Sequence, residues 1–221
     1  MRTVAAFFTA QAIVESTKQL LADLVPGCRV ISIIEDAMIQ DVIAAGRVTP
    51  EIARRLIRYY LAAEETGADL IFNTCSSIGD VAVMARSLIK IPIVKIDDAM
   101  AAEAVRLGAR IGVLATLPTT LAPTVRLVKA QAEKAGRNVS IVEGLAKGAY
   151  EALVTKQPER HDEMVMVAAE QVAEQVDIIV LAQGSMARME ASLAQRTGKP
   201  VLSSPRRGVL EVKETLERMG R

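Results

Sequence analysis

The sequence predicts an α/β protein made of two similar lobes, each with a four-stranded parallel sheet flanked by helices. Short apolar runs rich in Val, Ile, Leu and Ala alternate with helical patterns, which is the order expected of βαβ units. The runs are continuous and do not alternate with polar residues, as in strands that helices cover on both faces. The pattern also repeats along the chain, which indicates two lobes.

The repeat has an offset of 108 residues and few identical positions. What recurs is the phase of strand ends, helix starts and prolines. The clearest matches pair Asp69–Ser77 with Asp177–Ser185, Arg2 with Arg110, Pro50 with Pro158 and Pro92 with Pro200. We therefore expect two Rossmann-like lobes related by pseudo-twofold symmetry, with the site between them.

The apolar runs and the amphipathic stretches place the individual elements. Expected strands are 2–8, 28–34, 69–74, 92–95, 110–115, 138–142, 177–182 and 200–203. Expected helices are 11–24, 50–66, 79–89, 97–107, 119–135, 158–175, 186–197 and 206–219. The first lobe is expected to comprise 1–97 plus 206–221 and the second 98–205, because the repeat matches the last helix to the one that follows residue 97. Thr49-Pro50-Glu51 is typical of a helix start, with a capping hydroxyl, a proline in the first turn and then an acid.

Composition excludes several classes of function. The net charge of +1 and the 3% of aromatic residues are untypical of nucleic-acid binding. No apolar run approaches the roughly 18 residues of a membrane span. The two cysteines, Cys28 and Cys75, do not make a disulfide framework, so free thiols and a cytoplasmic location are expected. The expected partner is a small molecule, with neither nucleic acid nor membrane, and a homo-oligomer is left open.

Parallel sheets bind ligands beyond the carboxyl ends of their strands, and four polar loops of this chain fall there. Three of them lead into helices, whose N-terminal N–H groups suit an anion such as a carboxylate. The candidate substrate-binding residues in these loops are Thr9, Gln11, Asn73, Ser76, Ser77, Thr116, Thr119, Thr120, Gly184 and Ser185. Their Ser and Thr side chains also suit helix caps, and the two roles are compatible.

Cys75 and Gln183 are the candidate catalytic positions of the two lobes. Cys75 lies where a strand stops and a helix begins, so we expect the helix to lower the pKa of its thiol and to make it an acid, a base or a nucleophile. Gln183 occupies the equivalent position in the second half of the repeat, 108 residues later. Its amide forms hydrogen bonds but does not exchange a proton near neutral pH. Cys28 opens a strand away from this edge and is interpreted as structural.

The other titratable residues singled out here are interpreted as structural or surface residues. His161 is the one histidine, and its charged neighbours lead us to interpret it as solvated surface. Cysteine and histidine are too few and too scattered for a metal site, and no cofactor motif occurs, so neither metal nor cofactor is expected. Asp97-Asp98 follows a strand and is interpreted as a helix cap, with a role in the site left open.

The segment Ile111-Gly-Val-Leu-Ala-Thr116 followed by Thr119, taken with Cys75 and the repeat, resembles the aspartate/glutamate racemase superfamily. That group also contains hydantoin racemases, maleate isomerases and arylmalonate decarboxylases, and the resemblance covers nearly the whole chain. It implies a cofactor-independent isomerase in which one cysteine on each lobe exchanges the α-proton of a small acid. By that pattern Cys75 is the first acid/base, and the substrate carboxylate is held by Ser76, Ser77, Thr116, Thr119 and the Gly184-Ser185 loop.

The second cysteine of that pattern is expected at position 183, where this chain has glutamine. A single thiol still delivers a proton to one face of an enolate, or attacks a carbonyl or double bond. The leading hypothesis is therefore a racemase or isomerase acting on an amino acid, a hydantoin or a dicarboxylate. The alternatives are a single-thiol decarboxylase (a lyase) or isomerase, and a non-catalytic module that binds an anion.

Overall fold

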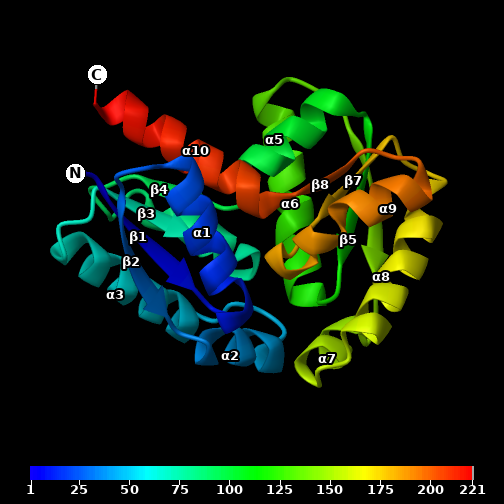
Figure 1. Ribbon diagram of the computed structural model, residues 1–221, viewed down its shortest axis with the longest axis horizontal. Coiled ribbons are helices and arrows are strands. Elements are labelled where there is room, and N and C mark those ends of the chain that lie inside the picture. Colours follow the sequence, from blue (N-terminus) through cyan, green and yellow to red (C-terminus); the bar gives the residue numbers. More distant parts are fainter. Residues whose placement is uncertain (221) are drawn as a thin grey trace. The chain divides into compact units, whose positions relative to one another are not determined.

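The computed structural model describes residues 1–220 and contains two sheets of four parallel strands each (Figure 1). The chain divides into unit 1, which holds residues 1–98 and the described residues from 205 onward, and unit 2, which holds residues 99–204. The strand order is β2-β1-β3-β4 in unit 1 and β6-β5-β7-β8 in unit 2. The predicted α/β fold with two parallel four-stranded sheets is thus confirmed, and both sheets have the same topology.

Unit 1 has helices on both faces of its sheet. Its strands are β1 (Thr3–Phe8), β2 (Arg29–Ile34), β3 (Leu70–Asn73) and β4 (Ile93–Lys95). Its helices are α1 (Val14–Leu24), α2 (Ala37–Ala45), α3 (Pro50–Glu65), α4 (Gly79–Ala85) and α10 (Ser204–Met219). Ala5 and Phe7 of β1 face α2, α3 and α4, whereas Val4, Ala6 and Phe8 face α1 and α10. Burial on both faces explains why β1 is apolar at every position.

Unit 2 repeats this arrangement. Its strands are β5 (Arg110–Ala115), β6 (Ser140–Leu145), β7 (Ile178–Leu181) and β8 (Val201–Ser203). Its helices are α5 (Asp98–Leu107), α6 (Pro118–Lys134), α7 (Ala149–Val154), α8 (Pro158–Ala173) and α9 (Glu190–Thr197). Helices α5 and α6 cover one face of the sheet, and α7, α8 and α9 pack on the other. Each sheet is therefore buried between two layers of helices.

The expected elements are found, with differences at some ends. Thr49 begins α3 as predicted, because its hydroxyl accepts a hydrogen bond from the Ile52 N–H at 3.4 Å. The strand predicted at 138–142 lies at 140–145 instead. The helices at 37–45 and 149–154 were not predicted. They are short and have no side-chain cap at their first residue, so tertiary packing rather than a local signal stabilises them.

An arginine–aspartate pair joins the first and third strands of each sheet. Asp69 binds the Arg2 guanidinium at 2.7 Å and the Thr3 N–H at 2.7 Å. Asp177 binds the Arg110 guanidinium at 2.6 Å and the Arg110 N–H at 2.9 Å. The two aspartates are a repeat apart, so the duplicated sequence preserves a polar link at the amino edge of each sheet.

Helix α10 lies directly against the end of β4. A side chain at Gly208 would come within 2.5 Å of the Ile96 carbonyl oxygen, so only glycine permits this approach. Ile96 immediately follows β4 and precedes Asp97, and it belongs to the apolar cluster that Val209 and Val212 of α10 complete. Close packing of α10 therefore supports the carboxyl edge of the first sheet.

Substitution of Gly208 by alanine is expected to destabilise the fold by about 1–3 kcal/mol, because backbone atoms block the added methyl group. Urea denaturation followed by circular dichroism measures this change in the free energy of unfolding. Gly220→Ala is the control, since an added methyl group there meets its nearest atom at an ordinary 3.7 Å. Equal midpoints for the two variants would contradict the proposed close contact.

Acid should weaken the link at Asp177. Hydrogen bonds from the Arg110 side chain and then from its backbone N–H lower the pKa of Asp177 from 3.8 to about 2. A carboxyl whose pKa is lower in the folded state stabilises the fold fully above its unfolded value and loses that effect as the pH falls from 3.8 to about 2. Urea midpoints between pH 6 and pH 2 should therefore fall more steeply for the natural chain than for Asp177→Asn. Parallel curves would show that the pair contributes nothing.

Candidate active site

Cys75 lies at the carboxyl edge of the first sheet. Strand β3 ends at Asn73, and the backbone at Cys75 is still extended, with φ −121° and ψ 115°, before a 3-10 turn at Ser76–Ile78 leads into α4. The Asn73 side-chain amide donates a hydrogen bond to the Cys75 carbonyl at 3.0 Å and thereby holds the loop. Ser76 and Ser77 are buried in the turn, whereas Cys75 keeps part of its surface exposed. The Cys75 residue is thus partly exposed where a strand ends, although burial dominates the surroundings of its sulfur.

Three donors converge on the Cys75 sulfur. They are the Thr9 hydroxyl, from the loop after β1, and the backbone N–H groups of Ser77 and Ile78. Burial nevertheless raises the pKa of the Cys75 thiol above its usual value, and Asp97 raises it further, while the three hydrogen bonds lower it only in part. The expectation that the helix start lowers this pKa is therefore wrong, because desolvation outweighs the N–H donors.

Buried polar atoms without partners gather near the thiol. The Tyr60 hydroxyl and the Asn73 side-chain oxygen make no hydrogen bond with any residue among 1–220. Tyr60 is fully buried, and its pKa is raised well above the usual value, by burial first and then by the charge of Cys75. An unsatisfied buried polar atom costs roughly 1–3 kcal/mol.

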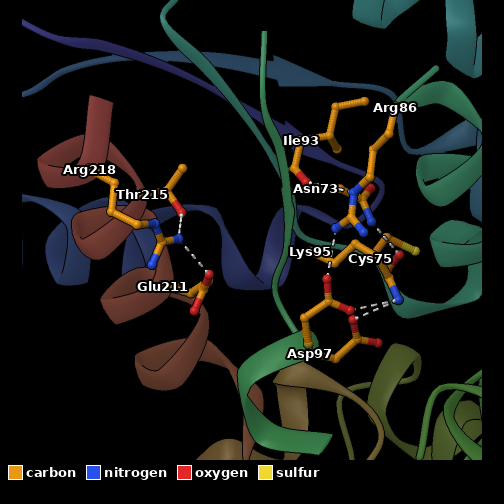
Figure 2. A network of polar contacts seen from close by, with 10 residues as sticks. Asn73, Cys75, Arg86, Ile93, Lys95, Asp97, Glu211, Thr215 and Arg218 are labelled. Carbon is orange, nitrogen blue, oxygen red and sulfur yellow. Dashed lines mark hydrogen bonds and ion pairs between the residues drawn. The ribbon is translucent and has the colours of Figure 1, made fainter. Parts of the chain in front are cut away.

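A network of charged side chains lies beside this loop (Figure 2). Lys95 ends β4, and its ammonium lies 3.5 Å from the Asp97 carboxylate and 3.2 Å from that of Asp98. Arg86 binds Asp98 at 2.8 Å and the Ile93 carbonyl at 3.1 Å. Burial alone would lower the pKa of Lys95, but Asp97 and Asp98 outweigh it and raise the pKa, so the ammonium is retained. Sequence reasoning missed Lys95 and Tyr60, although a lysine inside the apolar run Ile91–Ile96 was a visible signal.

The equivalent loop of unit 2 carries Gln183. Its side-chain oxygen accepts a hydrogen bond from the Thr116 N–H at 2.7 Å, and its amide group donates one to the Thr116 hydroxyl at 2.8 Å. The predicted residues Thr116 and Gln183 are thus brought together at the carboxyl edge of β5 and β7. Both functional groups of the glutamine are occupied within its own unit, so Gln183 braces two loops.

The remaining predicted site residues have different environments. Thr119 and Thr120 start α6, and the Thr119 hydroxyl is buried without a partner among residues 1–220, while Thr120 is buried. Gly184 and Ser185 are half-buried at the start of the turn that follows Gln183. Gln11 is exposed in the turn after β1. Thr9, Asn73 and Ser77 therefore contact the Cys75 residue directly, and Gln11 is left facing solvent.

The interpretation of His161 as solvated surface is wrong. His161 is completely buried, and its Nδ1 lies 2.7 Å from the Asp162 carboxylate, which also binds Arg188. The reason is helical periodicity, because residue 161 lies one turn before Val165 on the buried stripe of α8. Its charged sequence neighbours Glu159, Arg160 and Glu163 are exposed, whereas Asp162 pairs with it.

Cys28 and a cavity of unit 2 lie away from the predicted site residues. Cys28 precedes β2, at the amino edge of the first sheet, so it lies at the opposite end of the strands from the Cys75 loop. A cavity of about 380 Å³ in unit 2 lies between the end of β6 and α8 and is lined by Lys147, Glu163, Met164 and Val167 among others. No predicted site residue lines it. Among residues 1–220, no group of three or more His, Cys, Asp or Glu side chains is placed to hold a metal ion.

The chain is similar to known proteins in sequence pattern and in fold. Residues 8–212 match the sequence model of the Asp/Glu/Hydantoin racemase family. Allantoin racemase from Klebsiella pneumoniae has a similar fold, with a TM-score of 0.71 and 17% identity over 100% of this chain and 89% of that one. Glutamate racemase from Bacillus anthracis gives a TM-score of 0.77 and 14% identity over 99% and 83% of the two chains. Aspartate racemase from Picrophilus torridus gives 0.71 and 12% over 97% and 95%.

No curated protein matches the chain by sequence. Within the described part of the chain, no helix has the length and apolar character that crossing a bilayer requires.

Replacing Thr9 by valine should make the Cys75 thiol less reactive, because it removes a hydrogen bond that lowers the thiol pKa. A hydrogen bond contributes about 0.5–1.5 kcal/mol, so the iodoacetamide rate near pH 8 should fall roughly two- to tenfold. The rate is measured in a Cys28→Ala background, in which Cys75 is the one thiol. Thr17→Val, in a buried threonine of α1, is the control. A rate unchanged in Thr9→Val would argue against the Thr9 contact.

Proposed function

We propose that this chain, which belongs to the Asp/Glu/Hydantoin racemase family, exchanges a proton at the carbon next to the carboxylate of a small acid through the thiol of Cys75. Membership of the family makes the chain a racemase-type enzyme, that is, an isomerase. The observation that carries the role of Cys75 is its place at a strand end, partly exposed, with three donors around its sulfur. General acid–base catalysis needs such a group within hydrogen-bond reach of the substrate.

We infer the substrate class from the relatives. The structurally similar proteins are racemases of allantoin, glutamate and aspartate, which are small polar molecules of the amino-acid or ureide type. An amino acid, a hydantoin-like ureide or a dicarboxylate is therefore the proposed substrate. Hydroxyls and N–H groups of the strand-end loops would bind its carboxylate, and the proposed contributors are Thr9, Asn73, Ser76, Ser77, Thr116, Thr119, Thr120, Gly184 and Ser185.

A second candidate is a reaction that uses one thiol only. Two observations favour it: Gln183 is engaged by Thr116, and the pKa of the Cys75 thiol is raised, so the sulfur carries a proton at neutral pH. A protonated thiol suits the delivery of a proton to one face of an enolate, as in a decarboxylation, tautomerisation or cis–trans isomerisation. In this version Gln183 contributes hydrogen bonds and no proton.

The test is incubation in D₂O with a panel of single enantiomers of aspartate, glutamate, allantoin and hydantoins, together with maleate and malonates. Nuclear magnetic resonance and chiral chromatography report deuterium at the α-carbon, inversion and loss of CO₂. Cys75→Ala should reduce any activity at least about 100-fold, the typical contribution of a general acid or base. Cys28→Ala, at the opposite edge of the sheet, should keep it.

The pattern of products separates the candidates. Deuterium with inversion supports racemisation, whereas deuterium on one face, or loss of CO₂, supports the one-thiol reaction. Full activity in Cys75→Ala would remove the proposed role of the thiol. Binding of an anion without turnover of any substrate in the panel would favour a module that binds without chemistry.

A further inference from the structure

The pairing of β3 with β4 brings Lys95 next to the Cys75 loop. Asn73 is in register with Lys95, and the pairing continues for one more residue through the Ile96 N–H, which donates to the Asn73 carbonyl at 2.9 Å. Ile71 and Ile93 face the core cluster that Cys75 also contacts, whereas Val94 and Ile96 face the opposite cluster. Strand alternation therefore places Asn73, Cys75 and Lys95 on the same side of the sheet.

The surroundings of Lys95 are built for a buried charge. A side chain at Gly79, the first residue of α4, would come within 2.8 Å of Lys95 Cε and 3.2 Å of Nζ. Glycine thus leaves the space in which the ammonium lies, only four residues after Cys75. Lys95 is 3% exposed, which makes it the one lysine buried to this degree among residues 1–220.

Asp97 is the more deeply buried of the two acids beside Lys95. It is 2% exposed, and its Oδ1 lies 3.5 Å from the Lys95 ammonium without the geometry of a hydrogen bond. Asp98, in contrast, keeps more exposed surface and is shared between Lys95 and Arg86. A buried charge pair is costly and does little for stability when its hydrogen bonds are incomplete. The incomplete pairing of Asp97 calls for another role.

We propose that Asp97, anchored by Lys95, is a positioning residue of the Cys75 site that keeps the proton on the sulfur, so that Cys75 acts as a proton donor. This deepens the proposed function and rests on it. The charged and titratable groups around the thiol are Asp97, Lys95, Asp98, Arg86 and Tyr60. The Asp97 carboxylate repels a developing thiolate, and the Lys95 ammonium lies 3.5 Å from that carboxylate.

The proposed step starts from the enolate of the one-thiol reaction, formed when a C–CO₂⁻ bond of the substrate breaks, CO₂ leaves and the electron pair of that bond stays on carbon. The S–H bond of Cys75 breaks as its proton moves to the enolate carbon of the substrate, and the electron pair of that bond stays on sulfur. A new C–H bond forms from the enolate electron pair. The thiolate next to Asp97 is then unfavourable, so it regains a proton from water before the next turnover.

The test is the pH dependence of iodoacetamide alkylation of Cys75 in the Cys28→Ala chain, which needs no substrate. Asp97→Asn removes the negative charge and should lower the midpoint of the alkylation curve by about one pH unit. Asp98→Asn, which removes the other acid bound to Lys95, is the matched control and should give a clearly smaller shift. The double variant Lys95→Met with Asp97→Asn removes both charges, and its midpoint should lie below that of Lys95→Met alone, which isolates the effect of Asp97 if the single variant Asp97→Asn fails to fold.

The outcomes are separable from those for the proposed function. An unchanged midpoint in both Asp97 variants, or an equal shift in Asp98→Asn, overturns the role of Asp97 whatever the reaction is. Where turnover is found, activity of a proton donor falls as the pH rises through the thiol pKa, and Asp97→Asn should move that fall to lower pH. If Asp97 had a structural role only, Asp97→Asn would lower kcat without changing the pH at which the activity falls. Activity retained in Cys75→Ala would instead defeat the proposed function and leave the alkylation result standing.

Discussion

The parallel pairing of β3 with β1 on one side and with β4 on the other is the constraint on which the Cys75 loop depends. It fixes where three chain segments end, and so it fixes which side chains meet. Thr9 arrives from β1, Asn73 and Cys75 from β3, and Lys95 from β4. A shift of one residue in either pairing would move the partner side chains to the other face of the sheet. The apolar alternation of β1 between two helix layers holds the register in place.

Two opposing effects decide the chemistry of the thiol. The Thr9 hydroxyl and the N–H groups of Ser77 and Ile78 favour the thiolate, as a strand-to-helix junction usually does. Burial and the Asp97 carboxylate favour the thiol, and together they are larger. The same donors that fail to ionise the resting sulfur still stabilise a thiolate formed during a reaction. This arrangement suits a general acid, which carries a proton at the start of the step and has lost it at the end.

The duplication preserved the framework and let the loops diverge. Both sheets have the same strand order, and both carry an Arg–Asp pair at the amino edge. At the carboxyl edge the counterpart of Cys75 is Gln183, which bonds Thr116. A framework residue is constrained by packing on every side, whereas a strand-end loop is constrained by few neighbours and is free to carry different chemistry. Divergence between the two halves is therefore expected where function resides.

The sequence by itself determined the α/β fold, the two equivalent sheets and most strands, because continuous apolar runs and in-phase prolines are local signals. It also placed Cys75, Thr9 and Asn73 at one sheet edge. It did not find α2 or α7, which are short and have no side-chain hydrogen bond at the N-cap, nor the burial of His161, which follows from its position on the stripe of α8. The direction of the Cys75 pKa and the approach of Lys95, Asp97 and Tyr60 were decided by the tertiary structure alone. Desolvation and charge act through space between atoms far apart in the chain, and no local pattern records how closely they pack.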